Sequence, residues 1–202
     1  MKSITIFGSP KTRTFRCLWT LEELGVPYEH ISVSPSEAKN PKYLKYQPLG
    51  KVPFALLDDE PLFESLAICI TLSDHYPEKN LIPRPGTRNR ALFEQWAHFS
   101  QTELDAPLWV RAKHQFVYPE EKRVKDIIPI TEEEYQNSIQ VISHALSHSP
   151  YLLGNDFTLA DLVVSHPIMW ARGLKLEIKD PIITDYIDRI RSRTAFLKAK
   201  EL

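Results

Sequence analysis

The chain has 202 residues, of which 43% are hydrophobic, and this is enough apolar material for one large packed domain or two small ones. Its 25 Lys and Arg against 26 Asp and Glu leave a net charge of -1, so no general attraction to nucleic acid or to an anionic membrane is expected. No apolar run approaches the roughly 18 residues of a membrane span, and the opening MKSITIFGSP lacks the apolar core of a secretory signal. We therefore expect a globular cytoplasmic protein. Its two cysteines, Cys17 and Cys69, are too few for a disulfide framework or a metal cluster and are expected to pack inside helices.

The first part of the chain predicts a strand, a helix and a second strand. Residues 4–7 form a β-rich run that stops at Gly8, and a helical pattern follows until Gly25. A second strand is expected over 28–33 after a short connection, and the two strands should run parallel by the usual βαβ rule. Residues 34–48 are polar and interrupted by prolines, with room for one helical turn.

The stretch from 49 to 68, LGKVPFALLDDEPLFESLAI, predicts a hairpin followed by a helix. Residues 54–57 are an apolar strand, and the turn formers at 58–61 return the chain through 62–63. Ser65 then precedes apolar positions that continue to about residue 76, which makes it a candidate N-cap. The order βαβ(α)ββα is that of a thioredoxin-like domain.

After residue 77 the pattern of the chain changes. Residues 77–86 hold three prolines and a glycine, which is typical of a linker between domains. We expect a first domain over 1–77, a linker over 78–87 and an all-helical domain over 88–202. The first helix of that domain should run from Arg88 to about residue 116, with a kink at Pro107 because proline removes a helix hydrogen bond.

Two more helices are predicted farther on. One covers about 131–147 and begins with acidic residues at the positive end of its dipole. The other starts at Thr158, where Thr158 and Asp161 have the spacing of a capping box. This box is expected to serve folding, because it pairs backbone donors at the helix start.

Residues 50–68, GKVPFALLDDEPLFESLAI, resemble the glutathione site of the glutathione S-transferase family. The family pattern is a Val-Pro with cis proline, a hairpin and then Glu-Ser-x-Ala-Ile. Each piece alone is ordinary loop or cap chemistry, but the pieces are uncommon together, in this order and at this spacing. The resemblance covers nearly the whole chain and implies the fold of that family, an α/β thioredoxin-like N-terminal domain followed by an all-α C-terminal domain.

The resemblance implies that glutathione is a co-substrate and that it is bound by Lys39, Lys51, Val52, Pro53, Glu64 and Ser65. Val52 would pair its backbone with the cysteinyl unit, since the proline after it favours an extended Val52. Glu64 would face the α-amino group, and the Ser65 hydroxyl with its helix N-terminus would face the α-carboxylate. Lys51 or Lys39 would take the glycyl carboxylate, the alternative for Lys51 being a solvated role.

Glutathione must react as a thiolate, and a free thiol with a pKa near about 8.5 is mostly protonated at neutral pH. One hydroxyl that donates to the sulfur can lower that pKa by roughly one unit, which is about 1.4 kcal/mol. Related bacterial and fungal transferases often have Ser-x-x-x-Arg at the start of the first helix, and counting back four from Arg16 reaches Thr12. Thr12 is thus the first candidate and Ser9 the second. Thr14 or a backbone N–H is a further alternative, and all these groups could also simply cap the helix.

The resemblance implies a homodimer that conjugates glutathione to an apolar electrophile, without nucleic acid or membrane partners. One alternative is a glutathione-dependent peroxidase or disulfide reductase on the same site. The absence of cysteine from residues 8–16 argues against disulfide exchange through an enzyme cysteine. Another alternative is a non-catalytic binding module of the same fold, as found in translation- and transcription-associated proteins.

A metal site is not expected. His144 and His148 have the i, i+4 spacing that two ligands on one helix face need, but no third ligand is evident. Solvated histidines are the better interpretation.

Overall fold

The computed structural model describes all 202 residues, and the chain forms two compact units. The first unit comprises Met1–Arg84 together with Arg191–Leu202, and the second comprises Pro85–Ile190. The sequence predicted a single C-terminal domain over 88–202. The last residues of the chain belong instead to the first unit.

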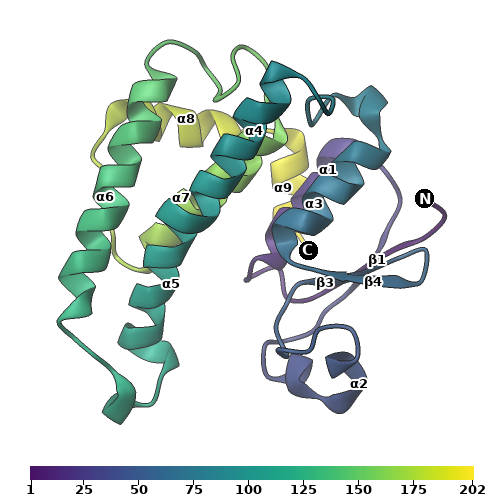
Figure 1. Cartoon of the computed structure of the whole chain (residues 1–202), viewed down its shortest axis with the longest axis horizontal. Helices are drawn as coiled ribbons and strands as arrows, with labels where there is room; N and C mark the ends of the chain where they lie inside the picture. Colours follow the sequence, from purple (N-terminus) through teal and green to yellow (C-terminus); the bar gives the residue numbers. More distant parts are fainter. The chain divides into compact units, whose positions relative to one another are not determined.

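The first unit contains a four-stranded sheet in the order β2-β1-β3-β4 (Figure 1). Its strands are β1 (Ile4–Phe7), β2 (Glu29–Ile31), β3 (Phe54–Leu57) and β4 (Glu60–Phe63). β1 and β2 are parallel, as predicted, whereas β3 is antiparallel to both β1 and β4. The β3–β4 turn consists of Asp58 and Asp59, whose φ angles of 52° and 69° suit a tight two-residue hairpin.

The helices of the first unit cover both faces of this sheet. They are α1 (Thr14–Leu24), η1 (Glu37–Lys39), α2 (Pro41–Leu44), α3 (Ser65–His75), η2 (Pro77–Lys79) and α9 (Thr194–Lys200). Helices α1 and α3 lie side by side on one face, and the α2 segment lies on the other (Figure 1). On the α2 side, Phe7 stacks on Phe54 with ring centroids 4.6 Å apart, and Tyr43 and Tyr46 close over the pair.

Helix α9 joins the first unit through α1. Phe196 packs edge-on against Phe15 and Trp19, with centroid distances of 5.4 and 5.1 Å. The guanidinium of Arg193 binds both carboxylate oxygens of Glu23 at 2.7 Å. These contacts explain why residues 191–202 belong with the first unit, although they follow the helical domain in sequence.

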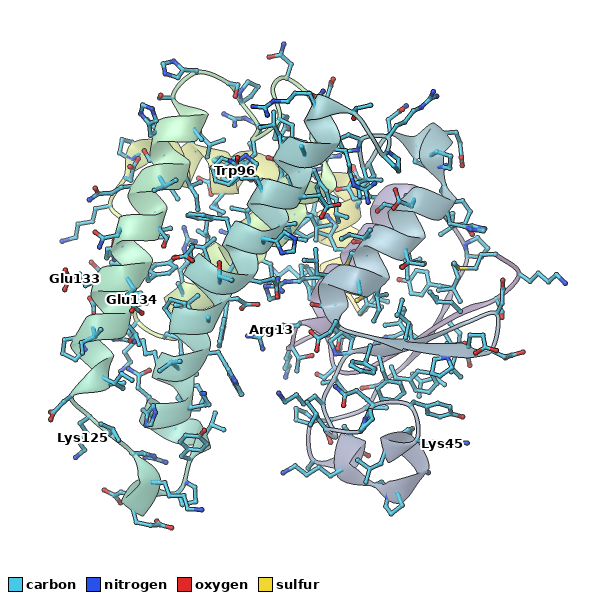
Figure 2. The ribbon with its side chains drawn as sticks, viewed as in Figure 1. Arg13, Lys45, Trp96, Lys125, Glu133 and Glu134 are labelled. Carbon is cyan, nitrogen blue, oxygen red and sulfur yellow. The ribbon has the colours of Figure 1, made fainter.

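The second unit is all-helical, as predicted. It contains α4 (Arg88–Phe99), η3 (Ser100–Asp105), α5 (Ala106–Ala112), η4 (Lys113–Val117), η5 (Glu120–Lys122), α6 (Ile127–Leu146), α7 (Leu159–Gly173) and α8 (Pro181–Arg191). Two of these segments, η3 and η4, are π-helical, so the long helix expected over 88–116 is interrupted twice. Helix α6 starts four residues before the predicted position, because a proline is tolerated in the first turn of a helix. Its exposed Glu133 and Glu134 are labelled in Figure 2.

Two prolines in the second unit remove helix donors, and a serine hydroxyl from another helix lies beside the carbonyl affected in each case. Pro167 lies inside α7 and cannot donate to the carbonyl of Val163, which instead accepts from the Ser100 hydroxyl at 2.7 Å. Pro107 likewise cannot donate to the carbonyl of Glu103, and the Ser138 hydroxyl lies 2.9 Å from that oxygen and also 2.9 Å from the Glu134 carbonyl of its own helix. In place of the kink expected at Pro107, a π-helical segment ends two residues before this proline.

None of the helices combines the length and the hydropathy that crossing a bilayer requires.

Candidate functional site

Three loops of the first unit meet at one end of the sheet. Phe7 is in register with Phe54, and Phe54 is in register with Phe63. The chain therefore leaves β1, enters β3 and leaves β4 at neighbouring positions. The segments brought together in this way are 8–13, Val52-Pro53 and Glu64-Ser65, which hold most of the residues singled out in the sequence.

Gly8 allows the first of these loops to approach the second. Its φ is 142°, and a Cβ added there would lie 2.1 Å from Thr14 Oγ1 and 3.0 Å from Val52 Cβ. Any side chain at this position would force the loop away from Val52. From the sequence, Gly8 was expected only to end the first strand, and its close approach to Thr14 and Val52 was not predicted. The signal that could have indicated this approach is a glycine directly after a strand.

Val52 and Pro53 are joined by a cis peptide bond. The β1–β3–β4 ladder begins at Phe54, so Val52 lies just outside the hydrogen-bonded register of the sheet. Its side chain is half-buried, and Pro53 is buried. Because Val52 precedes the paired part of β3, its backbone lies at the end of the sheet, where an extended peptide could pair with it.

Glu64 and Ser65 form the start of α3. Glu64 has a φ of 74° and an exposed side chain, whereas Ser65 is only 4% exposed. The carbonyl of Glu64 accepts from the Ile68 N–H at 3.0 Å, which closes the first turn. The N–H groups at the start of this helix, together with its dipole, make this end favourable for an anion.

Two consecutive residues of α1 hold Ser65 from behind. Arg16 is fully buried, and its Nη1 donates to Ser65 Oγ at 3.5 Å. The thiol of Cys17 donates to the Ser65 carbonyl at 3.8 Å. Burial raises the pKa of Cys17, so it is a protonated structural thiol. As the sequence predicted, both Cys17 and Cys69 are buried inside helices.

The two candidate activating hydroxyls lie in the loop before α1. The Thr12 hydroxyl donates to the Ser9 carbonyl at 2.7 Å and lies 2.9 Å from Thr14 Oγ1. The Ser9 hydroxyl accepts from the Lys11 N–H at 3.3 Å. The Thr12 hydroxyl therefore helps to order the loop, and its proton can reach a thiol only after the hydroxyl rotates about its C–O bond.

Lys39 lies beside Gly50, the residue that precedes Lys51. A Cβ on Gly50 would lie 3.1 Å from Lys39 Cγ, so the stem of Lys39 passes directly beside the residue before Lys51. Both lysines are exposed. Figure 2 labels another exposed lysine, Lys45, which directly follows α2.

The His144 and His148 rings are 6.0 Å apart in an edge-on arrangement. No group of three or more His, Cys, Asp or Glu side chains suited to a metal ion occurs in the structure.

The chain is similar in sequence to two family profiles and to several known proteins. Residues 2–71 match the profile described as glutathione S-transferase, N-terminal domain, and residues 106–194 match that of the C-terminal domain. The chain is 30% identical over 207 residues to glutathione S-transferase F7 of Arabidopsis thaliana, with 98% of this chain and 99% of the relative covered. It is also 29% identical to elongation factor 1-gamma 2 of Oryza sativa subsp. japonica, over 78% of this chain and 38% of that protein.

A solved structure with the same fold is the glutathione transferase URE2P6 from Phanerochaete chrysosporium in complex with oxidized glutathione. It superposes with a TM-score of 0.88 at 25% sequence identity and covers 99% of this chain and 96% of that one. The matched region includes residues of both units of the chain.

Proposed function

Because the chain belongs to the glutathione S-transferase family, we propose that it binds glutathione at this end of the sheet and conjugates it to an electrophilic small molecule. The observation that carries the proposal is the strand register, which brings Val52-Pro53 and Glu64-Ser65 to one end of the sheet. An extended tripeptide with a carboxylate at each end suits such a place. Val52 supplies backbone pairing, and the start of α3 supplies donors for the γ-glutamyl carboxylate.

The remaining polar groups of glutathione meet charged side chains. Glu64 faces the α-amino group, which is a cation. Lys39, which lies beside Gly50, and Lys51, the residue after Gly50, offer cations to the glycyl carboxylate. The charges of this arrangement are complementary at both ends of the peptide.

In the chemical step, the Thr12 hydroxyl turns from the Ser9 carbonyl and donates to the glutathione sulfur, which favours the thiolate, and the thiol proton is released to water. The thiolate then attacks an electrophilic carbon, a sulfur–carbon bond forms, and the electron pair leaves with the displaced group. Ser9 is the second candidate for this donor, because its hydroxyl accepts from Lys11 and retains its own proton. No cysteine takes part, since Cys17 is buried behind Ser65.

Two other functions are compatible with the same site. Glutathione bound here could reduce hydroperoxides, which would be seen as faster turnover of cumene hydroperoxide than of a chlorinated aromatic. The likeness to elongation factor 1-gamma 2 favours a second candidate, a binding module without turnover.

The first test is calorimetry with glutathione on the parent and on Thr12→Ala, together with the ultraviolet band of the thiolate at neutral pH. We expect binding at or below millimolar concentration and a thiolate band that is lost in Thr12→Ala. A band retained in Thr12→Ala and lost in Ser9→Ala would assign the role to Ser9. The double change Glu64→Ala with Ser65→Ala should weaken binding by about tenfold or more, because charge-assisted hydrogen bonds are lost.

The outcomes separate the candidates. Unchanged affinity in the double variant would reject the assignment of the γ-glutamyl site. A parent that does not bind glutathione would leave the binding module as the better interpretation. Lys125→Ala is a matched control, since Lys125 lies in the second unit outside the proposed site.

We also propose that the protein is a homodimer and acts in the cytoplasm, both of which are typical of the family. Exposed apolar side chains are present on the first unit, with Leu49 exposed to 67% and Phe63 to 41%.

A further inference from the structure

We propose that His30 is a positioning residue for the thiolate of bound glutathione. Its ring holds the Gly8 carbonyl on the β2 side of β1, so that the next backbone group, the Ser9 N–H, faces the side on which Val52 lies. The inference rests on the proposed function and extends it to a residue outside the three loops of the site. His30 acts through the peptide between Gly8 and Ser9 and does not touch the ligand.

The first step concerns the hydrogen bonds of Gly8. Its N–H donates to the carbonyl of Ile31 at 3.0 Å, and its carbonyl oxygen lies 2.8 Å from Nε2 of His30. Both partners belong to β2, so both polar groups of Gly8 face that strand. A carbonyl can only accept, and Nε2 therefore carries the hydrogen whether the ring is neutral or charged. The contact persists in both states of the ring.

The second step follows from the geometry of the peptide between Gly8 and Ser9. This peptide is trans, and in a planar trans peptide the N–H points opposite to the carbonyl. Because β1 lies between β2 and β3, a Gly8 carbonyl held toward β2 directs the Ser9 N–H toward the β3 side. Val52 lies on that side, and a Cβ added to Gly8 would be 3.0 Å from its Cβ.

The third step is that glycine makes this orientation depend on an outside partner. Gly8 has a φ of 142°, and without a Cβ its neighbouring peptide planes turn at little steric cost. If the peptide after Gly8 turned over, its carbonyl oxygen would face the Val52 side in place of the N–H. The proposed site brings the cysteinyl sulfur to that side, where the negative end of a carbonyl dipole would disfavour a thiolate. The hydrogen bond from His30 opposes this turn.

The same peptide also sets the position of the loop that carries Thr12. The carbonyl of Ser9 accepts from the Thr12 N–H at 3.0 Å and from the Thr12 hydroxyl at 2.7 Å. Ser9 directly follows the restrained peptide, so a turn there would displace the acceptor that holds Thr12. His30 thus fixes two donors at once, the Ser9 N–H and the Thr12 hydroxyl.

The test compares glutathione with S-methylglutathione, which keeps both carboxylates but cannot form a thiolate. Titration of the ultraviolet thiolate band gives the pKa of the bound glutathione thiol in the parent and in His30→Leu, and calorimetry gives the affinity for each peptide. In His30→Leu this pKa should rise by about one unit, which corresponds to about tenfold weaker binding of the thiolate. Affinity for S-methylglutathione should stay within about twofold, because other residues hold the two ends of the peptide.

Two further variants separate positioning from a general disturbance of β2. His30→Gln carries an amide donor with a reach similar to that of Nε2, so it should restore most of the parent's pKa for the bound thiol. Glu29→Leu removes the contact of the neighbouring residue with the Thr5 hydroxyl, at 3.4 Å, and should leave that pKa unchanged. Thermal unfolding checks that each variant is folded. If His30→Leu does not fold, His30→Asn replaces it with the same expectation, because its amide is too short to reach the Gly8 carbonyl.

The outcomes separate this role from the proposed function. A bound thiol with the parent's pKa in His30→Leu, or in His30→Asn, overturns the role of His30 while glutathione binding stands. An equal rise in Glu29→Leu, or an equal loss of affinity for S-methylglutathione, also overturns it, because a disturbed strand then explains the result. A parent that binds neither peptide, or that leaves the thiol pKa at its value in free glutathione, would instead contradict the proposed function.

Discussion

At the scale of single residues, the carboxylate of Asp161 is buried and accepts several hydrogen bonds. It accepts from the Leu152 N–H at 2.9 Å, from the Thr158 N–H at 2.8 Å, and from the hydroxyls of Thr158 and Tyr186, both at 3.1 Å. Thr158 and Asp161 form the capping box that the sequence predicted. Burial raises the pKa of Asp161 to about 6, although these hydrogen bonds act in the opposite direction.

This pKa predicts how the stability should depend on pH. Asp161 loses its proton near pH 4 in the unfolded chain but only near pH 6 in the folded one, so the folded state binds the proton more strongly between these values. The free energy of unfolding of the parent, minus that of Asp161→Asn, should therefore be largest below about pH 4 and fall on the order of 3 kcal/mol by pH 7. Urea denaturation of both proteins across this range measures the difference. A difference that grows with pH would mean that the hydrogen bonds outweigh burial.

At the scale of secondary structure, a proline inside α7 removes a helix donor, and a serine from another helix replaces it. Ser100 supplies the donor that Pro167 lacks for Val163, while the Ser138 hydroxyl lies 2.9 Å from both the Glu103 and the Glu134 carbonyls. A buried carbonyl without a partner is costly, and this explains why hydroxyls occupy buried positions on η3 and α6.

The repair can be tested with a double-mutant cycle. Ser100→Ala should lower the free energy of unfolding by about 1 to 3 kcal/mol, because the Val163 carbonyl is left unpaired inside the unit. Adding Pro167→Ala restores an N–H within the helix, so the double variant should recover most of that loss. Chemical denaturation of the four proteins gives the coupling. Ser147→Ala at the exposed end of α6 is the control and should change stability by less than about 0.5 kcal/mol. Additive losses would contradict the repair.

At the scale of the whole molecule, the last helix of the chain, α9, belongs to the first unit and not to the helical unit that precedes it in sequence. Arg193 and Phe196 attach α9 to α1, the helix that also holds Ser65 through Arg16 and Cys17. The helix at the proposed site is thus packed between segments that are far apart in sequence. Its order depends on the last dozen residues of the chain as well as on its neighbours in the sheet.

The proposed homodimer is a property of the whole molecule. Sedimentation equilibrium at micromolar concentration should give twice the mass of the chain. Leu49→Asp should shift the equilibrium toward monomer, because Leu49 exposes 67% of its surface and would gain most by burial against a second copy. Val141→Asp, which is exposed to 49% on α6 of the second unit, is the comparison. A parent with the mass of one chain would show the dimer prediction to be wrong.

The sequence by itself predicted features that depend on neighbouring residues. The strand and helix order of the first unit, the helical second half and the capping box at Thr158 follow from local periodicity and cap chemistry. The proposed residues Val52, Pro53, Glu64 and Ser65 were likewise visible, because each pair lies within one short motif. How these pairs meet was not visible, since the register of β1, β3 and β4 joins separate segments.

Only the tertiary structure decided the contacts between distant segments. Gly8 allows the loop to reach Val52, Arg16 lies behind Ser65, and α9 belongs to the first unit. The sequence placed α9 with the helical domain because chain order was the only guide. In the structure, α9 packs where its apolar side chains are buried. Phe196 contacts Phe15 and Trp19, which lie near the start of the chain. Burial of side chains depends on such long-range contacts, and a local pattern does not contain them.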